Sequence, residues 1–161
     1  MRSSKELFFN IIRILLVAAL IVFIIVMHTG DKDSKTSLDD MKAAISGSMD
    51  MSTTYEATNL EFKRNFALNA SDYDGVCYYA PLSAMDAEEV LIVRLSDSSQ
   101  ADEVVSAINS WAEQRETTFE GYAPEQYALV QDRLIIQKGN YVLYVVNAEN
   151  SKAKEAFNKA Y

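Results

Sequence analysis

The sequence predicts an α+β fold: an antiparallel four-stranded sheet with helices packed mainly on one face, preceded by one N-terminal transmembrane helix. An apolar run over Leu7–Met27 would form a helix about 30 Å long, which matches the hydrocarbon core of a bilayer. Behind it, two pairs of β-rich segments flank a long amphipathic segment. The connections between these segments are short, and this arrangement is typical of a compact α+β domain.

The apolar run has the features of an uncleaved single-pass anchor. Arg2 and Lys5 precede it, and this bias of basic residues predicts a cytoplasmic N-terminus and an extracytoplasmic C-terminal domain. No A-x-A cleavage site and no lipobox cysteine follow the run. A cleaved signal peptide is the alternative, because the uninterrupted apolar core, Ile14–Met27, is short. The residues that mark the predicted anchor are Leu7, Phe8, Ile14, Leu20, Ile25 and Met27.

The segments around the anchor define the expected organisation of the chain. We expect a cytoplasmic tail over residues 1–6, the anchor over residues 7–28, a linker over residues 29–37 and an extracytoplasmic α+β domain over residues 38–161. The linker is polar and lacks apolar periodicity, which predicts irregular structure. The segment that follows it is long enough to build a hydrophobic core of its own.

The first half of the domain combines two helices with two strands. Leu38–Ser48 and Asn59–Leu68 carry apolar residues at helical spacing, and Ser37 can cap the first of them. Val76–Ala80 is rich in residues that favour strands. Glu89–Leu95 is apolar at most positions, which is typical of a central strand that is buried on one face and half buried on the other.

The second half is predicted to contain three helices and a β-hairpin: Gln100–Glu120, Pro124–Asp132 and Ser151–Tyr161 as the helices, and Leu134–Lys138 with Tyr141–Asn147 as the hairpin strands. The long helix repeats its apolar residues every three or four positions, and this spacing places Trp111 on the core face. Gly139-Asn140 separates the two strands, and such a pair predicts a tight turn with a positive φ.

Composition excludes several classes of function. The net charge of −8 argues against a nucleic-acid binder, which needs a basic surface. Cys77 is the sole cysteine, so no intramolecular disulfide forms, and its apolar neighbours predict a buried thiol. The sole histidine, His28, precedes the domain, which therefore lacks the ligands that zinc prefers and the base that a nucleophile uses. Asp72 and Asp74 lack the glutamate that completes a calcium loop. We expect no metal site and no cofactor.

Paired carboxylates are the remaining enzyme chemistry. Glu88 with Glu89, or Asp102 with Glu103, could in principle catalyse hydrolysis by acid and base. Neighbouring residues on a strand point to opposite faces, however, and acids at a helix start stabilise the helix dipole. We therefore assign no catalytic residue and expect the chain not to be an enzyme, with an envelope hydrolase as the alternative.

Tyrosine is unusually frequent, with nine residues in the chain. Tyrosines suit recognition surfaces because they bring apolar area and a hydroxyl group at low entropy cost. Strand tyrosines also pack across a sheet with their hydroxyls at the surface, which is the alternative explanation. Tyr122 and Tyr127 flank Pro124 beside a predicted helix start, and this makes them the first choice for a binding edge.

Three segments, AEEVLIVRL (Ala87–Leu95), FEGYAPEQ (Phe119–Gln126) and KGNYVLYVV (Lys138–Val146), resemble domain-of-unknown-function family 4358. Together with the apolar run, they look like the exported, membrane-attached domains of this family in Gram-positive anaerobes. Many members carry a lipobox cysteine, whereas this chain carries an apolar run, and both features imply attachment to the outer face of the membrane. The resemblance implies no agreed activity and no catalytic residues.

The sequence thus predicts a membrane-anchored extracytoplasmic domain that acts as a binding or scaffold module of the cell envelope. Its expected partners are the lipid bilayer, through the anchor, and an envelope protein or wall polymer, through the domain. An accessory subunit of a membrane complex is a further alternative.

Overall fold

The computed structural model describes residue 9, residues 12–22 and residues 32–161. The chain divides into two compact units, Met1–Lys32 and Asp33–Tyr161. In the first unit, residues 12–22 are helical. Of the helices in the described residues, none is both long enough and apolar enough to cross a bilayer. The predicted tail, residues 1–6, and residues 29–31 of the predicted linker lie outside the described residues. The predicted anchor, residues 7–28, lies partly outside them.

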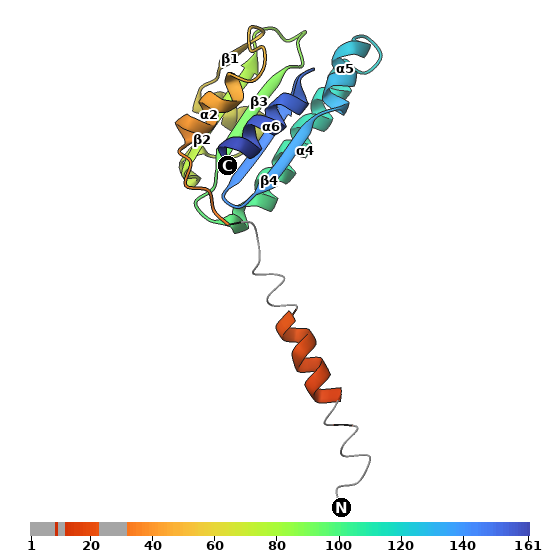
Figure 1. Ribbon diagram of the computed structural model, residues 1–161. Helices are drawn as coiled ribbons and strands as arrows, with labels where there is room; N and C mark the ends of the chain where they lie inside the picture. Colours follow the sequence, from red (N-terminus) through yellow and green to blue (C-terminus); the bar gives the residue numbers. More distant parts are fainter. Residues whose placement is uncertain (1–8, 10–11, 23–31) are drawn as a thin grey trace, which may run out of the picture. The chain divides into compact units, whose positions relative to one another are not determined.

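The second unit is an α+β domain built on one antiparallel sheet (Figure 1). The strands lie in the order β1-β2-β3-β5-β4, and each pairs antiparallel with its neighbours. Their bounds are Thr54–Glu56 for β1, Gly75–Pro81 for β2, Glu89–Arg94 for β3, Leu134–Lys138 for β4 and Tyr141–Val146 for β5. The sheet thus has five strands in the described residues, and the prediction of four is wrong. The additional strand, β1, has three residues, too few to show an apolar alternation, and its pairing with β2 defines it.

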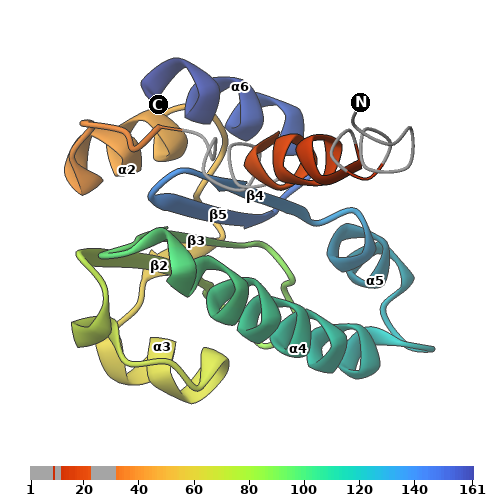
Figure 2. The same ribbon diagram turned by 90° about the horizontal axis from the view of Figure 1, so that it is seen from below.

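Helices cover both faces of the sheet (Figure 2). One face packs against α3 (Asn59–Phe66), α4 (Ala101–Phe119) and α5 (Pro124–Gln131), and the other against α2 (Leu38–Ser46) and α6 (Asn150–Ala160). The prediction that helices pack mainly on one face is therefore wrong. The cause is the composition of the central strands: every residue of β5 is fully buried, so both of its faces need an apolar cover.

Local signals account for several boundaries. Thr58 and Glu61 form a capping box at the start of α3, and Ser37 caps α2 by accepting a hydrogen bond from the backbone of Asp40. The two-residue turn between β4 and β5 is confirmed, with a φ of 47° at Gly139. Short 3₁₀ helices, η1 (Ala70–Asp72) and η2 (Ser98–Gln100), precede β2 and α4. Cys77 is buried, as predicted, on the α2–α6 face.

The chain enters the domain at one end of the sheet. The backbone N–H of Ser34 donates to Asn140 Oδ1 at 2.8 Å, and the Ser34 hydroxyl donates to the Tyr161 carbonyl at 2.9 Å. Asn140 is in the β4–β5 turn. The next residue, Tyr141, pairs with Arg94 at the end of β3. We call this the Arg94 end of the sheet. The opposite end, where β3 begins, is the Glu89 end.

Candidate functional site

The two tyrosines predicted to form a binding edge lie in different surroundings. Tyr122 follows α4 and is 53% exposed, and its hydroxyl donates to the Met85 sulfur at 3.5 Å. Tyr127 lies in α5 and is half-buried against the core beneath α4. Its hydroxyl accepts a hydrogen bond from Gln131 at 3.1 Å. The structure thus leaves Tyr122 open to a partner, while the ring of Tyr127 packs mainly inside the domain.

Exposed apolar side chains gather on the loops at the Glu89 end. Leu82 and Met85, in the loop between β2 and β3, are 62% and 56% exposed. Together with Tyr122 they form what we call the apolar edge. Large apolar side chains that are exposed close together often mark a site where another molecule binds. The apolar edge is therefore the candidate binding surface of the domain.

The two loops that carry the apolar edge are tied to each other and to the core. Gln126 of α5 accepts a hydrogen bond from the backbone N–H of Ala87 at 2.8 Å. The Arg115 guanidinium donates to the carbonyl of Asp86. The Tyr122 ring also packs on Phe119, with 6.3 Å between the ring centroids. These contacts order the edge before any partner binds, which lowers the entropy cost of binding.

The residues between Tyr122 and Tyr127 line a shallow hollow on the surface. It is lined by Ala123, Pro124, Glu125 and Gln126, at the start of α5. Pro124 occupies the first helical turn, where its missing N–H costs no hydrogen bond. The hollow presents one carboxylate, Glu125, and the edge beside it is apolar. Such a surface can hold an apolar side chain of a partner and carries little chemistry of its own.

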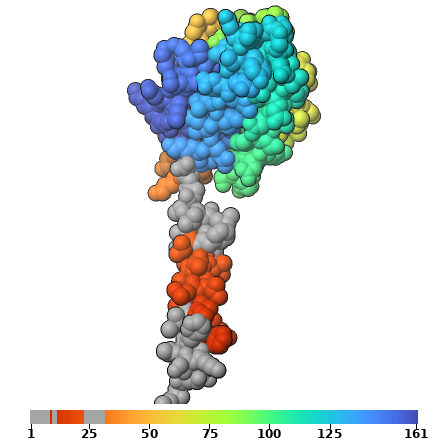
Figure 3. Space-filling model, turned by 90° about the vertical axis from the view of Figure 1, so that its right-hand side faces the viewer, coloured from red at the N-terminus to blue at the C-terminus, as the bar shows by residue number. Residues whose placement is uncertain are grey.

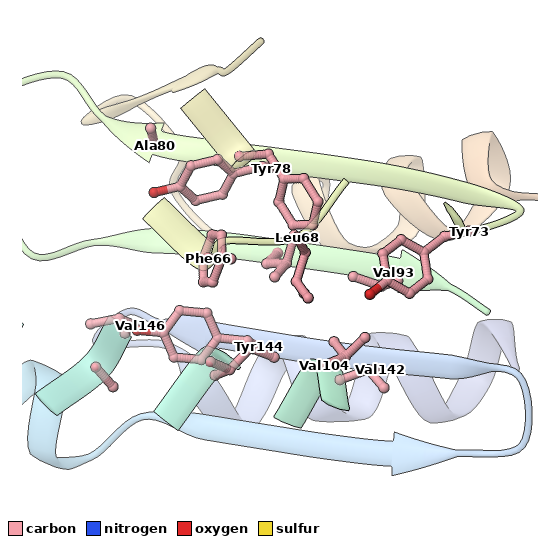
Figure 4. Packing of buried hydrophobic residues seen from close by; sticks show 14 of the residues in the cluster. Phe66, Leu68, Tyr73, Tyr78, Ala80, Val93, Val104, Val142, Tyr144 and Val146 are labelled. Atoms are coloured by element: carbon pink, nitrogen blue, oxygen red, sulfur yellow. The ribbon is translucent and has the colours of Figure 1, made fainter. Parts of the chain in front are cut away.

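A buried carboxyl group lies in the core at the same end of the sheet. Glu89, the first residue of β3, is fully buried. Its oxygens accept hydrogen bonds from Tyr78 and Tyr144, each at 2.8 Å, and from the Trp111 indole at 2.9 and 3.0 Å. We call these four residues the Glu89 cluster. Phe66 lies between the rings of Tyr78 and Tyr144 (Figure 4), and its ring also contacts that of Trp111, with 5.9 Å between the centroids.

The surroundings of the Glu89 cluster raise the pKa values of its ionisable side chains. Burial raises the pKa of Glu89, and the hydrogen bonds from Trp111 and Tyr78 and the nearby charge of Arg115 oppose that rise. Burial, with the charge of Glu89, also raises the pKa of Tyr78 and of Tyr144. The tyrosines therefore stay protonated at neutral pH and act as hydrogen-bond donors. The cluster is a fully satisfied polar group inside an apolar core.

The geometry gives the Glu89 cluster a structural role. The side chain is fully buried, and its hydrogen-bond partners are two buried tyrosines and the half-buried Trp111. Its sequence neighbour Glu88 points elsewhere and accepts hydrogen bonds from Thr53 and from Asn147. The two carboxylates therefore do not face one another across a cleft, as a hydrolase would need. Among the described residues, no three or more His, Cys, Asp or Glu side chains come together as metal ligands.

Sequence reasoning missed the Glu89 cluster. It placed Trp111 on the core face of the long helix, where the side chain is half-buried against the core, but treated Glu89 only as one member of an acidic pair. A signal was present, because Glu89 precedes four consecutive apolar residues of its strand and faces the same core as two strand tyrosines. A carboxylate in such a strand needs donors, and Tyr and Trp are the residues that combine a large apolar body with one donor.

A family model for a domain of unknown function, DUF4358, matches residues 47–147. The chain belongs to the DUF4358 family. This confirms the resemblance stated from the three sequence segments. No curated protein and no solved structure matches the chain. The matched DUF4358 region holds all five strands together with α3, α4 and α5, and therefore both the Glu89 cluster and the apolar edge. The helices α2 and α6, which cover the other face, lie outside the match.

Proposed function

We propose that this DUF4358 chain is a membrane-anchored extracytoplasmic module that binds an envelope protein through the apolar edge. The observation that carries the proposal is the exposure of Leu82, Met85 and Tyr122 on two ordered loops. Aromatic and methionine side chains are enriched at protein interfaces, where they bury large areas. A partner that covers this edge would bury those three side chains.

The position of the apolar edge supports the same proposal. Ser34 holds the entering chain at the Arg94 end of the sheet, whereas the apolar edge is at the Glu89 end. If Leu7–Met27 is a transmembrane anchor, its tether joins the domain at the end away from the edge. The edge then stays accessible to a partner in the envelope.

Site-specific photocrosslinking in cells tests the proposal. A photoreactive amino acid in place of Tyr122 is expected to give a discrete crosslinked product, because this side chain would lie inside the interface. The matched control is the same amino acid in place of Leu60, which is 75% exposed on α3 and outside the apolar edge. A third variant carries it in place of Leu20, in the predicted anchor.

The three positions separate the candidate functions. A product at position 122 and none at position 60 supports binding through the apolar edge. Equal products at both positions, or none at position 122, would contradict it. A product at position 20 alone would instead favour an accessory subunit that associates through its anchor.

A further inference from the structure

The strand β4 is an edge of the sheet, and one side of its backbone is unpaired. In the register with β5, Lys138 lies opposite Tyr141 and Ile136 opposite Leu143. Because a two-residue turn is flanked by a hydrogen-bonded pair, Lys138 and Ile136 direct their backbone groups toward β5. The alternate residues, Ile135 and Gln137, direct their N–H and C=O groups outward. Within the described residues, these outward groups have no hydrogen-bond partner.

The two edges of the sheet differ in how they are protected. At the other edge, β1 is only three residues long, and Glu56 forms an ion pair with Lys42 of α2. Short strands and charged side chains are the usual protection of an edge against pairing with other chains. By contrast, β4 is five residues long and carries three consecutive apolar residues, Leu134, Ile135 and Ile136, each half-buried. Its backbone edge is therefore available for strand pairing.

The surface around β4 is open along the strand. Figure 3 shows this side of the domain, where the blue atoms around β4 lie exposed between those of α6 and those of α4. Leu134 and Ile136 belong to the face that α6 covers, and Lys138 lies on the same face with its ammonium 4.2 Å from the Tyr161 ring centroid. No carboxylate of the described residues forms an ion pair with Lys138.

We propose that β4 is a docking edge for an extended segment of another protein, which adds a strand to the sheet. The outward groups of Ile135 and Gln137 supply the backbone hydrogen bonds, as in other cases of strand addition. Apolar residues of the incoming segment pack beside Leu134 and Ile136, and an acidic residue pairs with Lys138. This docking edge is separate from the apolar edge and goes beyond the function proposed above.

A second copy of the chain fits the same edge poorly. Pairing of two antiparallel β4 strands places a two-fold axis perpendicular to the sheet, so the two copies of α6 would lie on the same face. Each α6 carries three lysines, Lys152, Lys154 and Lys159, and one carboxylate, Glu155, so the two copies would carry like net charges that repel one another. The two copies would also receive their tethers at opposite ends of the joined sheet, because Ser34 marks the Arg94 end of each. A single extended segment avoids both conflicts.

Amide hydrogen exchange with a peptide probe tests the proposal on the full chain in detergent micelles. The probe is an acetylated hexapeptide, Glu-Thr-Val-Thr-Val-Thr, at millimolar concentration. In the free protein, the amides of Ile135 and Gln137 are expected to exchange at least about tenfold faster than those of Ile136 and Lys138, which bond to β5. The peptide is expected to slow exchange at Ile135 and Gln137 by about tenfold or more, in a saturable way.

Two controls make the outcome decisive. Gln137→Pro removes one outward N–H at a position where an edge strand tolerates proline, and it should abolish the protection, whereas Gln137→Thr should retain it. The same peptide N-methylated on its edge-facing amides should also give no protection, which tests the pairing without any change to the protein. The proposal is overturned if the outward amides are already protected from exchange in the free monomer. It is also overturned if the unmodified peptide does not slow their exchange, or if the N-methylated peptide slows it as well. Protection that grows with protein concentration alone would instead identify a second copy as the occupant.

Discussion

Replacement of Glu89 by alanine is expected to lower the free energy of unfolding by about 3–5 kcal/mol. The change leaves the hydroxyls of Tyr78 and Tyr144 and the Trp111 indole without an acceptor inside the core. It also leaves the buried Arg115 guanidinium without its nearby negative charge. Urea unfolding of the full chain in detergent, followed by circular dichroism, measures the loss.

The matched control is Glu88→Ala, which removes a carboxylate of the same type one residue away. Glu88 is only partly buried and bonds to Thr53 and Asn147, so its loss should cost about 1 kcal/mol. Equal losses for the two variants would contradict the structural role assigned to the Glu89 cluster.

The pH dependence follows from the raised pKa of Glu89. Between the ordinary value of 4.5 and the raised value in the folded state, the folded protein binds more protons at this site than the unfolded chain. The stability contributed by this site is therefore greatest below 4.5 and falls as the pH rises through that window. Glu89→Gln removes the titration, so the difference in unfolding free energy between parent and variant should change with pH there and be constant above it. A difference that is flat across the window would contradict the raised pKa.

The second large effect is expected from Phe66→Ala, with a loss of about 3–5 kcal/mol in the free energy of unfolding. Phe66 is buried, and its ring centroid lies 5.1 Å from that of Tyr78 and 5.9 Å from that of Trp111. Its removal leaves a cavity among the three aromatic rings of the Glu89 cluster. The fluorescence of Trp111, the sole tryptophan, should change in the folded variant because its ring loses this neighbour.

Phe66→Leu is the control for that experiment, because it keeps most of the apolar volume. Its expected loss is smaller, about 1 kcal/mol, since similar volumes are tolerated in cores. If leucine and alanine destabilise the domain equally, ring packing against the cluster is not what stabilises this part of the core.

The helices and the long strands could be predicted from the sequence because each carries its own local signal. The apolar spacing of the long helix and the Gly139-Asn140 turn are of this kind, and both lie where they were expected. Pairing order and layers depend on contacts between distant segments, and the short strand β1 is defined only by its pairing with β2. The density of apolar residues in β5 is the signal that the prediction of helices mainly on one face overlooked, because a strand that is buried on both faces needs helices on both sides.

The candidate site was only partly within reach of sequence reasoning. Tyr122 was selected because it flanks Pro124 beside a predicted helix start, and it is exposed in the structure. Tyr127 was selected on the same ground, but its position in α5 turns the ring toward the core. Neither Met85 nor the Glu89 cluster could be found from spacing alone, because their neighbours come from other parts of the chain.

Labelling of intact cells with a membrane-impermeant maleimide tests the central claim, a domain held at the outer face of a membrane. The parent chain serves as the unlabelled control. Its one cysteine, Cys77, should not react, because it is buried and burial raises the pKa of its thiol to about 11. Asn158→Cys places an exposed thiol on α6, and Ser4→Cys places one in the predicted cytoplasmic tail. The account predicts that Asn158→Cys is labelled in intact cells and stays in the membrane fraction, while Ser4→Cys is labelled only after lysis. Labelling of Asn158→Cys only after lysis, or its release from the membrane fraction, would contradict the account.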